Sequence, residues 1–133
     1  MAAHAGDDED TPLPLAARQG KLAAVQVLLD HGGVQVVHVR NKHGWTPLHA
    51  AVLGECPDII RLLLEHGADA TAQDNDYATP LHLAAQNGKF EAVRVLLELG
   101  ASTHERDKMC KSAFELASTG GHQEIIELLS KHL

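Results

Sequence analysis

A seven-residue segment that returns at nearly constant spacing constrains the fold of this chain more than any other feature. It reads Trp-Thr-Pro-Leu-His-Ala-Ala at residues 45–51, and Thr-Pro-Leu-His-Leu-Ala-Ala returns at residues 79–85. Weaker versions stand at residues 11–17 and 112–118, so the threonine-equivalent positions 11, 46, 79 and 112 are separated by 35, 33 and 33 residues. Self-similarity at such a period is typical of a solenoid of stacked units.

Each unit is predicted to contain two helices. Threonine is a good helix N-cap and proline is favoured at the first helical position, so Thr46-Pro47 and Thr79-Pro80 each predict a helix start. A second helix follows, because apolar residues recur at three- and four-residue steps, as in residues 59–64. Glycines are expected to end these second helices, at Gly32, Gly67 and Gly100. A helix pair cannot bury both of its faces alone, and stacking the pairs solves that problem.

The polar stretches between helix pairs are predicted to form turns or hairpins that project sideways, as at residues 68–74. Residues 33–39 contain two extra residues and alternating valines, which predict a longer first finger with more strand-like pairing. Two interpretations of this insertion stay open: a tolerated loop insertion, or a protrusion that contributes to specificity.

Residues 11–133 resemble the ankyrin repeat family, through the Thr-Pro-Leu-His and Ala-Ala motifs, the Leu-Leu pairs and His-Gly-Ala-Asp at residues 66–69. The resemblance implies an all-α ankyrin-repeat solenoid of four stacked helix-turn-helix units with β-hairpin fingers and a protein-binding concave side. The repeats are expected at about residues 11–40, 41–73, 74–106 and 107–133. Residues 1–10 include four adjacent acids and are predicted to form an acidic flexible tail.

Several residues depart from the repeat pattern. Pro14 and Glu115 replace the motif histidine in the first and last repeats, which makes the two ends more polar. Solenoids need polar end caps, so four repeats are interpreted as the complete unit. Glu55 stands where a turn usually carries glycine, with Gly54 one place early, and this predicts a reshaped turn. Two further residues stand where the fingers usually have glycine, Tyr77 and Cys110.

Charge and cysteine content narrow the function classes. A formal net charge of −7 argues against nucleic acid and anionic membrane as partners, since both require a dominant basic face. No apolar run reaches the length of a membrane span, and no secretory signal pattern is found at the N-terminus. Cys56 and Cys110 lie two repeats apart, on the order of 20 Å and too far to bridge. A cytoplasmic or nuclear monomer is expected.

Catalytic and metal chemistry find little support in the sequence. Of ten histidines, His49 and His82 belong to the repeat motif, where the resemblance implies bonds to the motif threonine and to neighbouring backbone. His31, His66 and His132 stand at second-helix ends, where they can bond helix carbonyls. Histidine pairs at helical spacing, Cys-x-x-Cys motifs, nucleophile motifs and phosphate-binding loops are all missing. No metal site, no cofactor and no enzymatic activity are predicted.

The partner-binding residues are predicted on the finger tips and on the exposed side of each first helix. Trp45 and Tyr77 are the single tryptophan and tyrosine of the chain, and both are typical hot-spot types. The other interpretation of Trp45 is that its ring packs against its own finger and helix. Two basic fingers flank an acidic one at Asp74 and Asp76, which favours a partner with acidic groups at both ends of its epitope. The candidate residues are Arg18, Gln19, Arg40, Lys42, His43, Trp45, Leu53, Gln73, Asn75, Asp76, Tyr77, Ala78, Gln86, Asn87, Arg106, Lys108, Met109 and Lys111.

The function predicted from these features is a non-enzymatic protein–protein interaction module. An adaptor or inhibitor that occupies its partner is favoured, with blocking preferred to bridging because no second domain is expected. The alternative is a structural spacer fragment of a larger scaffold protein, which an exposed apolar end face at repeat four would favour. A histidine-based pH sensor is a third alternative, and it requires a sharp change in binding or melting between about pH 5 and 7.

Overall fold

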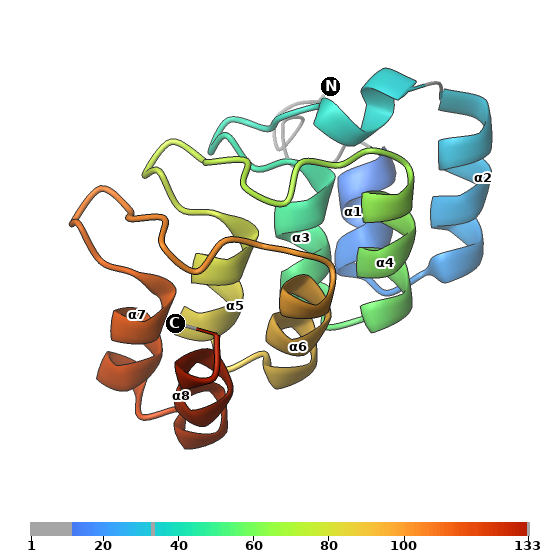
Figure 1. The fold of residues 1–133 in the computed structure, drawn as a ribbon. Helices are drawn as coiled ribbons and strands as arrows, with labels where there is room; N and C mark the ends of the chain where they lie inside the picture. The colour runs from blue at the N-terminus through green and yellow to red at the C-terminus, as the bar shows by residue number, and fades with distance from the viewer. Residues whose placement is uncertain (1–11, 33, 133) are drawn as a thin grey trace.

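The computed structural model describes residues 12–32 and 34–132, which form an all-helical stack (Figure 1). These residues contain eight α-helices, one 3₁₀ helix and no strand, which confirms the predicted all-α solenoid. The predicted tail at residues 1–10 lies outside the described residues. The α-helices are α1 (Pro12–Arg18), α2 (Leu22–Gly32), α3 (Pro47–Gly54), α4 (Pro57–Glu65), α5 (Pro80–Gln86), α6 (Phe90–Glu98), α7 (Ala113–Gly120) and α8 (Gln123–Ser130), and η1 (Val34–His38) is the 3₁₀ helix.

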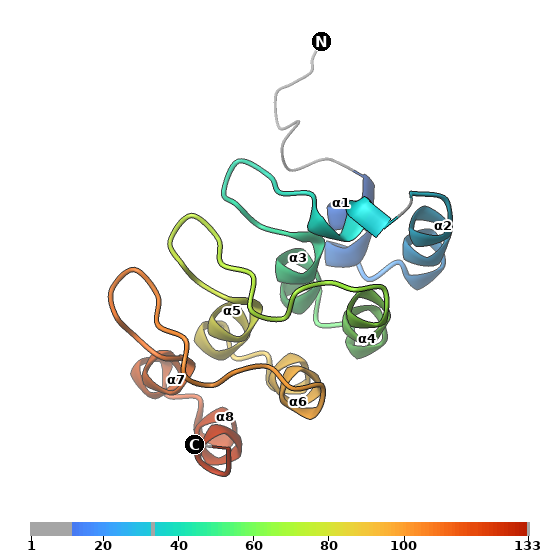
Figure 2. The same cartoon turned by 45° about the horizontal axis from the view of Figure 1, so that its top comes forward.

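The helices form two parallel rows, and the connecting fingers project from one of them (Figure 2). The inner row consists of α1, α3, α5 and α7, and the outer row of α2, α4, α6 and α8. Each helix packs against its neighbours in the same row and against its partner in the other row. The core between the rows is aliphatic and includes the fully buried side chains of Leu48, Ile59, Leu81 and Leu96. Each helix pair therefore depends on the adjacent pairs for burial, as expected for a solenoid.

The predicted helix caps are confirmed at atomic level. Thr46 and Thr79 cap α3 and α5, each with proline in the first turn and with the motif histidine completing a capping box. Ser112 caps α7 in the same way, with the carboxylate of Glu115 in place of the histidine ring. The backbone N–H of Ser112 lowers the pKa of Glu115 by stabilising its charged form. The polar replacement in the last repeat therefore preserves the cap.

Histidines at the ends of three second helices also occupy the predicted positions. The Nδ1 atoms of His31, His66 and His132 lie 2.9, 2.9 and 3.1 Å from the carbonyl oxygens four residues earlier. Each ring therefore donates a further hydrogen bond to a carbonyl near the C-terminal end of its helix. The two cysteines are free, as predicted, with Cys56 half-buried and Cys110 exposed.

The reshaped turn after α3 has a steric cause. A Cβ atom on Gly54 would lie 2.5 Å from the carbonyl oxygen of Arg18, so α1 approaches α3 too closely for any larger residue. Gly54 is therefore the last residue of α3, and the left-handed conformation that follows falls on Glu55, with φ at 57°. Tyr77 and Cys110 also have positive φ, at 62° and 63°. All three non-glycine residues accept a conformation that glycine adopts without strain.

The predicted hairpins are not confirmed, because the described residues contain no strand. The three fingers have their tips at residues 41–45, 74–78 and 107–111. Each tip is closed by a tight turn instead, in which the backbone N–H of its first residue (Asn41, Asp74 or Asp107) donates to the carbonyl four residues later. The strand-like pairing predicted for residues 33–39 is wrong. Residues Val34–His38 form the 3₁₀ helix η1, with Val37 buried in the core. The two extra residues therefore lie in the segment that follows α2, and the tip of the first finger has the same length as the other tips.

Candidate functional site

Buried histidines fasten the second and third fingers to the inner helices that precede them, α3 and α5. The Nδ1 atom of His49 accepts a hydrogen bond from the backbone N–H of Thr46, at 3.1 Å. Its Nε2 therefore carries the proton and donates to the carbonyl oxygen of Ala78 in the next finger, at 2.9 Å. His82 repeats this arrangement with Thr79 and the carbonyl of Lys111. Burial lowers the pKa of His49, so the neutral form that this geometry needs is favoured.

Hydrogen bonds join neighbouring fingers in register. Arg40 Nη1 donates to the carbonyl of Gln73 at 2.7 Å, and also to Gly44 in its own finger at 2.7 Å. The side chain of Asn75 donates to the carbonyl of Lys42 at 2.8 Å, and its backbone N–H bonds to the first finger as well. The amide of Lys108 bonds to the carbonyl of Asp76 at 2.8 Å. These bonds fix the spacing of the finger tips before any partner arrives.

Trp45 links the first and second fingers. Its indole Nε1 donates to Asp74 Oδ2 at 3.0 Å, while Asp74 Oδ1 accepts the amides of Asp76 and Ala78. The ring is half-buried and lies 5.6 Å from the ring of His43. The sequence interpretations, a hot spot or packing against its own finger, both overlooked this contact with the next repeat.

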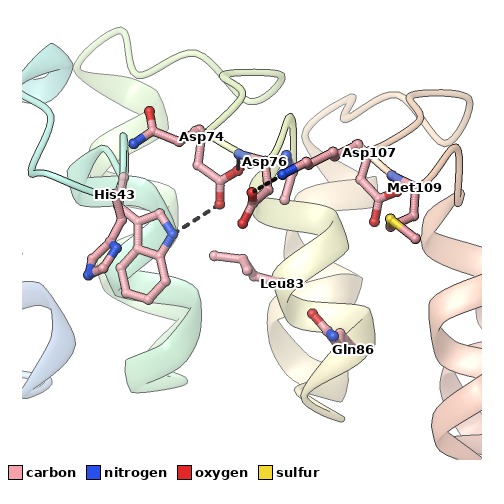
Figure 3. A pocket seen from close by; sticks show the side chains of 11 residues that line it. His43, Asp74, Asp76, Leu83, Gln86, Asp107 and Met109 are labelled. Atoms are coloured by element: carbon pink, nitrogen blue, oxygen red, sulfur yellow. Dashed lines mark hydrogen bonds and ion pairs between the residues drawn. The ribbon is translucent and has the colours of Figure 1, made fainter.

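A groove of about 710 Å³ runs between the fingers and the inner helices (Figure 3). His43 stands at one end, Asp107 and Met109 stand at the other, and Asp74 and Leu83 lie between them, Leu83 on α5. Leu83 is 8% exposed, and Met109, on the third finger, is 72% exposed. The lining residues are His43, Trp45, Asp74, Asn75, Asp76, Ala78, Leu83, Gln86, Asp107, Lys108 and Met109.

The structure brings many of the predicted residues to this groove and adds Leu83 and Asp107, which the sequence-based prediction missed. It also adds Asp74, which that prediction named only for its charge. Leu83 stands where Ala50 stands one repeat earlier. The sequence signal for its role was therefore an apolar side chain larger than the one at the equivalent position. Asp107 shares its finger position with Asp74, and the spacing of 33 residues was again the available signal. The predicted residues in the groove are His43, Trp45, Asn75, Asp76, Ala78, Gln86, Lys108 and Met109.

Other predicted residues lie outside this groove. Arg18 lines a smaller hollow of about 180 Å³ that shares His43 and Trp45 with the groove. Leu53 packs against the core, and Asn87 bonds the end of α5. Tyr77 is 56% exposed at the tip of its finger and is not a lining residue. The remaining candidates are exposed on the turn after α1 and on the fingers: Gln19, Arg40, Lys42, Gln73, Arg106 and Lys111. Which of these residues contact a partner stays a prediction.

The charges at the groove differ from the simple alternation of basic and acidic fingers. The guanidinium of Arg106 is held by the carbonyl of Cys110 and the carboxylate of Glu115. The lining itself contains the carboxylates of Asp74, Asp76 and Asp107 against one ammonium group, so its formal charge is −2 (three negative, one positive, histidine neutral). Lys108, which carries that ammonium, lies 3.9 Å from Asp76. The groove is therefore acidic.

Within residues 12–32 and 34–132, no group of three or more histidine, cysteine, aspartate or glutamate side chains is arranged to hold a metal ion. None of the helices in this part of the chain is long and apolar enough to cross a bilayer.

The rows of helix pairs, the histidine-capped inner helices and the projecting fingers define a repeat solenoid with a preformed groove. A family model described as ankyrin repeats in three copies matches residues 2–74 and 68–132, so the chain belongs to the ankyrin-repeat family. Repeats of this family generally serve as protein–protein interaction modules, and the fold is typically non-enzymatic.

Relatives among curated proteins share the repeats. The B-cell lymphoma 3 protein homolog of Mus musculus is 42% identical over 76 residues, which cover 56% of this chain and 17% of that protein. Protein phosphatase 1 regulatory subunit 27 of Homo sapiens is 41% identical over 61 residues, covering 46% of this chain and 38% of that protein. The 2-5A-dependent ribonuclease of Homo sapiens is 43% identical over 72 residues, covering 53% of this chain and 10% of that protein. The chain thus matches less than a fifth of the B-cell lymphoma 3 and ribonuclease relatives.

Proposed function

We propose that this protein binds a partner protein in the groove between its fingers and inner helices, and acts as an adaptor or inhibitor without enzymatic activity. The observation that carries the proposal is the arrangement of Met109, Trp45 and Leu83 along one groove on an internally bonded frame. We further propose that the protein is a monomer in the cytoplasm or nucleus. We also propose that its repeats span about residues 11–40, 41–73, 74–106 and 107–133.

The energetic argument rests on preorganisation. Binding that must first order flexible loops loses part of its interaction energy to that ordering. Here the finger tips are already joined by hydrogen bonds between repeats, such as the one from Asn75 to Lys42 at 2.8 Å. Burying the exposed thioether of Met109 and the open face of Trp45 then contributes directly to affinity, because tryptophan is enriched in hot spots and methionine in interfaces.

The acidic groove supports a protein partner over nucleic acid or an anionic membrane. Its formal charge of −2, in a chain of net charge −7, repels phosphate groups. One relative is named as a regulatory subunit of a phosphatase. This supports the proposal that the present protein acts by binding to another protein.

Affinity capture with matched variants tests the proposal. The wild-type protein, Met109→Glu and Leu99→Glu are immobilised and exposed to the same cell lysate. Both positions are exposed apolar residues, but Met109 lines the groove, whereas Leu99 caps α6 in the outer row. We expect a partner that is captured by the wild type and by Leu99→Glu and is lost with Met109→Glu. A partner lost with Leu99→Glu but kept by Met109→Glu would place the interface elsewhere.

A second candidate function, a spacer within a larger scaffold, is favoured by one observation. Val27 and Val39 are exposed and line an apolar hollow of about 330 Å³ at repeat one, with Leu28 and Val36. The spacer alternative is favoured by an exposed apolar end face at repeat four, whereas this hollow lies at repeat one. For a spacer, Met109→Glu would leave every captured protein in place, whereas Val27→Glu would remove contacts at the end face.

A further inference from the structure

Each of the three fingers begins its turn with an asparagine or an aspartate, at positions 41, 74 and 107. In each finger the Oδ1 atom of that residue accepts the amides two and four residues later, at 2.8 to 3.0 Å. The turn needs only this one oxygen, because Asn41 forms it as well as Asp74 and Asp107 do. The second oxygen of each aspartate is therefore available for another donor.

The second oxygen has different surroundings in the two aspartate fingers. Asp74 Oδ2 accepts the indole N–H of Trp45 from the preceding finger, at 3.0 Å. One repeat later, Asp107 stands in the place of Asp74, and Ala78 stands in the place of Trp45. Alanine has no side-chain donor, and among the described residues no donor reaches Asp107 Oδ2. The third finger thus lacks a counterpart of the indole N–H donor that Trp45 provides to Asp74 in the second finger.

The vacant position opens into the groove. Ala78 and Asp107 both line it, together with Leu83 and Met109 (Figure 3). A small residue at position 78 leaves space beside the apolar side chains of Leu83 and Met109, with a carboxylate at one edge. One repeat earlier the equivalent acceptor is occupied by the indole N–H of Trp45. The later repeat keeps the acceptor and adds apolar side chains, since Leu83 and Met109 stand in the places of Ala50 and Asp76.

We propose that an arginine of the partner protein occupies this position, with its guanidinium laid beside Leu83 and Met109 and one N–H donating to Asp107 Oδ2. This inference rests on the proposed function, since it specifies what the partner places in the groove. A guanidinium is flat like an indole, carries N–H donors in its plane and is weakly hydrated for a cation. Its charge also offsets the formal charge of −2 in the groove, which a partner tryptophan would leave unbalanced.

Three substitutions separate this contact from general electrostatics. Asp107→Asn keeps the turn, as Asn41 shows, but removes the charge. Asp76→Asn is the matched control, because Asp76 is a more exposed acid of the same groove and lies on the neighbouring finger. Ala78→Trp restores the residue type of position 45 and lets the protein's own indole fill the position. Circular dichroism and urea denaturation establish that each variant folds.

The probe is a library of random peptides displayed on phage and selected on the wild-type protein. We expect selected peptides to share an arginine, and replacement of that arginine by citrulline, its neutral isostere, to weaken binding about tenfold or more. Asp107→Asn should weaken the same peptides about tenfold or more, and Asp76→Asn less than about threefold. Ala78→Trp should abolish their binding while the protein stays folded.

The outcomes distinguish this inference from the proposed function. Peptides that are lost with Met109→Glu but share no arginine, or that bind Asp107→Asn as tightly as wild type, would overturn the arginine contact and leave the groove function standing. Peptides that bind Met109→Glu with undiminished affinity would show that the groove is not the binding surface, and both proposals would then fail.

Discussion

The hydrogen bond between Trp45 and Asp74 should contribute measurably to stability, because it joins two repeats. Trp45→Phe keeps most of the ring and removes the donor. Asp74→Asn keeps the turn, as Asn41 does in the first finger, and removes the charged acceptor. With the double variant, these two substitutions form a cycle that isolates the pairwise interaction from the packing of the ring.

The expected coupling follows from the geometry. The donor–acceptor distance is 3.0 Å, Asp74 is buried and Trp45 is half-buried. Hydrogen bonds to charged groups contribute about 1.5 to 3 kcal/mol, and partial exposure of the indole places this bond at the lower end. We therefore expect a coupling free energy of about 1 to 2 kcal/mol, and a melting temperature lowered by roughly 3 to 8 °C in Trp45→Phe.

Urea denaturation followed by far-ultraviolet circular dichroism is the appropriate assay. Fluorescence is unsuitable, because Trp45 is the single tryptophan of the chain and is lost in two of the variants. The four proteins must share one m value, so that unfolding free energies are comparable. A coupling within about 0.3 kcal/mol of zero would refute the reasoning and also remove the template on which the arginine proposal is built.

Three further predictions concern the frame. Gly54→Ala should lower the free energy of unfolding by about 1 to 3 kcal/mol in urea denaturation, because its Cβ would lie 2.5 Å from the carbonyl oxygen of Arg18. Glu55→Gly should raise it by about 0.5 to 1 kcal/mol in the same assay by relieving the positive φ of 57°; no gain would contradict this account of the turn. Because the folded-state pKa of His49 is lowered, the unfolded chain binds more protons below about pH 6.5. The melting temperature should therefore fall as pH decreases from 6.5 to 5.5, less steeply in His49→Gln, and an equal slope in both proteins would argue against this role.

Local sequence signals predicted the helices well, because they act over a few residues. The Thr-Pro starts of α3 and α5, the glycines at the ends of α2, α4 and α6, and the histidine bonds to helix carbonyls all depend on neighbours along the chain. The replacement of the motif histidine by Glu115 was recognised as a departure, but its retained capping role became visible only in the structure.

The errors and omissions arise where contacts between repeats decide the outcome. The alternating valines of residues 33–39 indicated a strand. Residues Val34–His38 form a 3₁₀ helix instead, in which Val37 packs into the core. The role of Trp45 was missed because its acceptor lies 29 residues away on the next finger. Asp107 was overlooked because its significance depends on Ala78, whose side chain carries no polar group.

Photo-crosslinking tests the central claim, that a partner protein lies in the groove, most directly. A benzophenone amino acid is introduced at position 109 in one variant and at position 99 in the other, replacing exposed apolar residues in the groove and in the outer row. The account predicts that a specific protein is crosslinked from position 109 and not from position 99. Crosslinking from position 99 alone would contradict it.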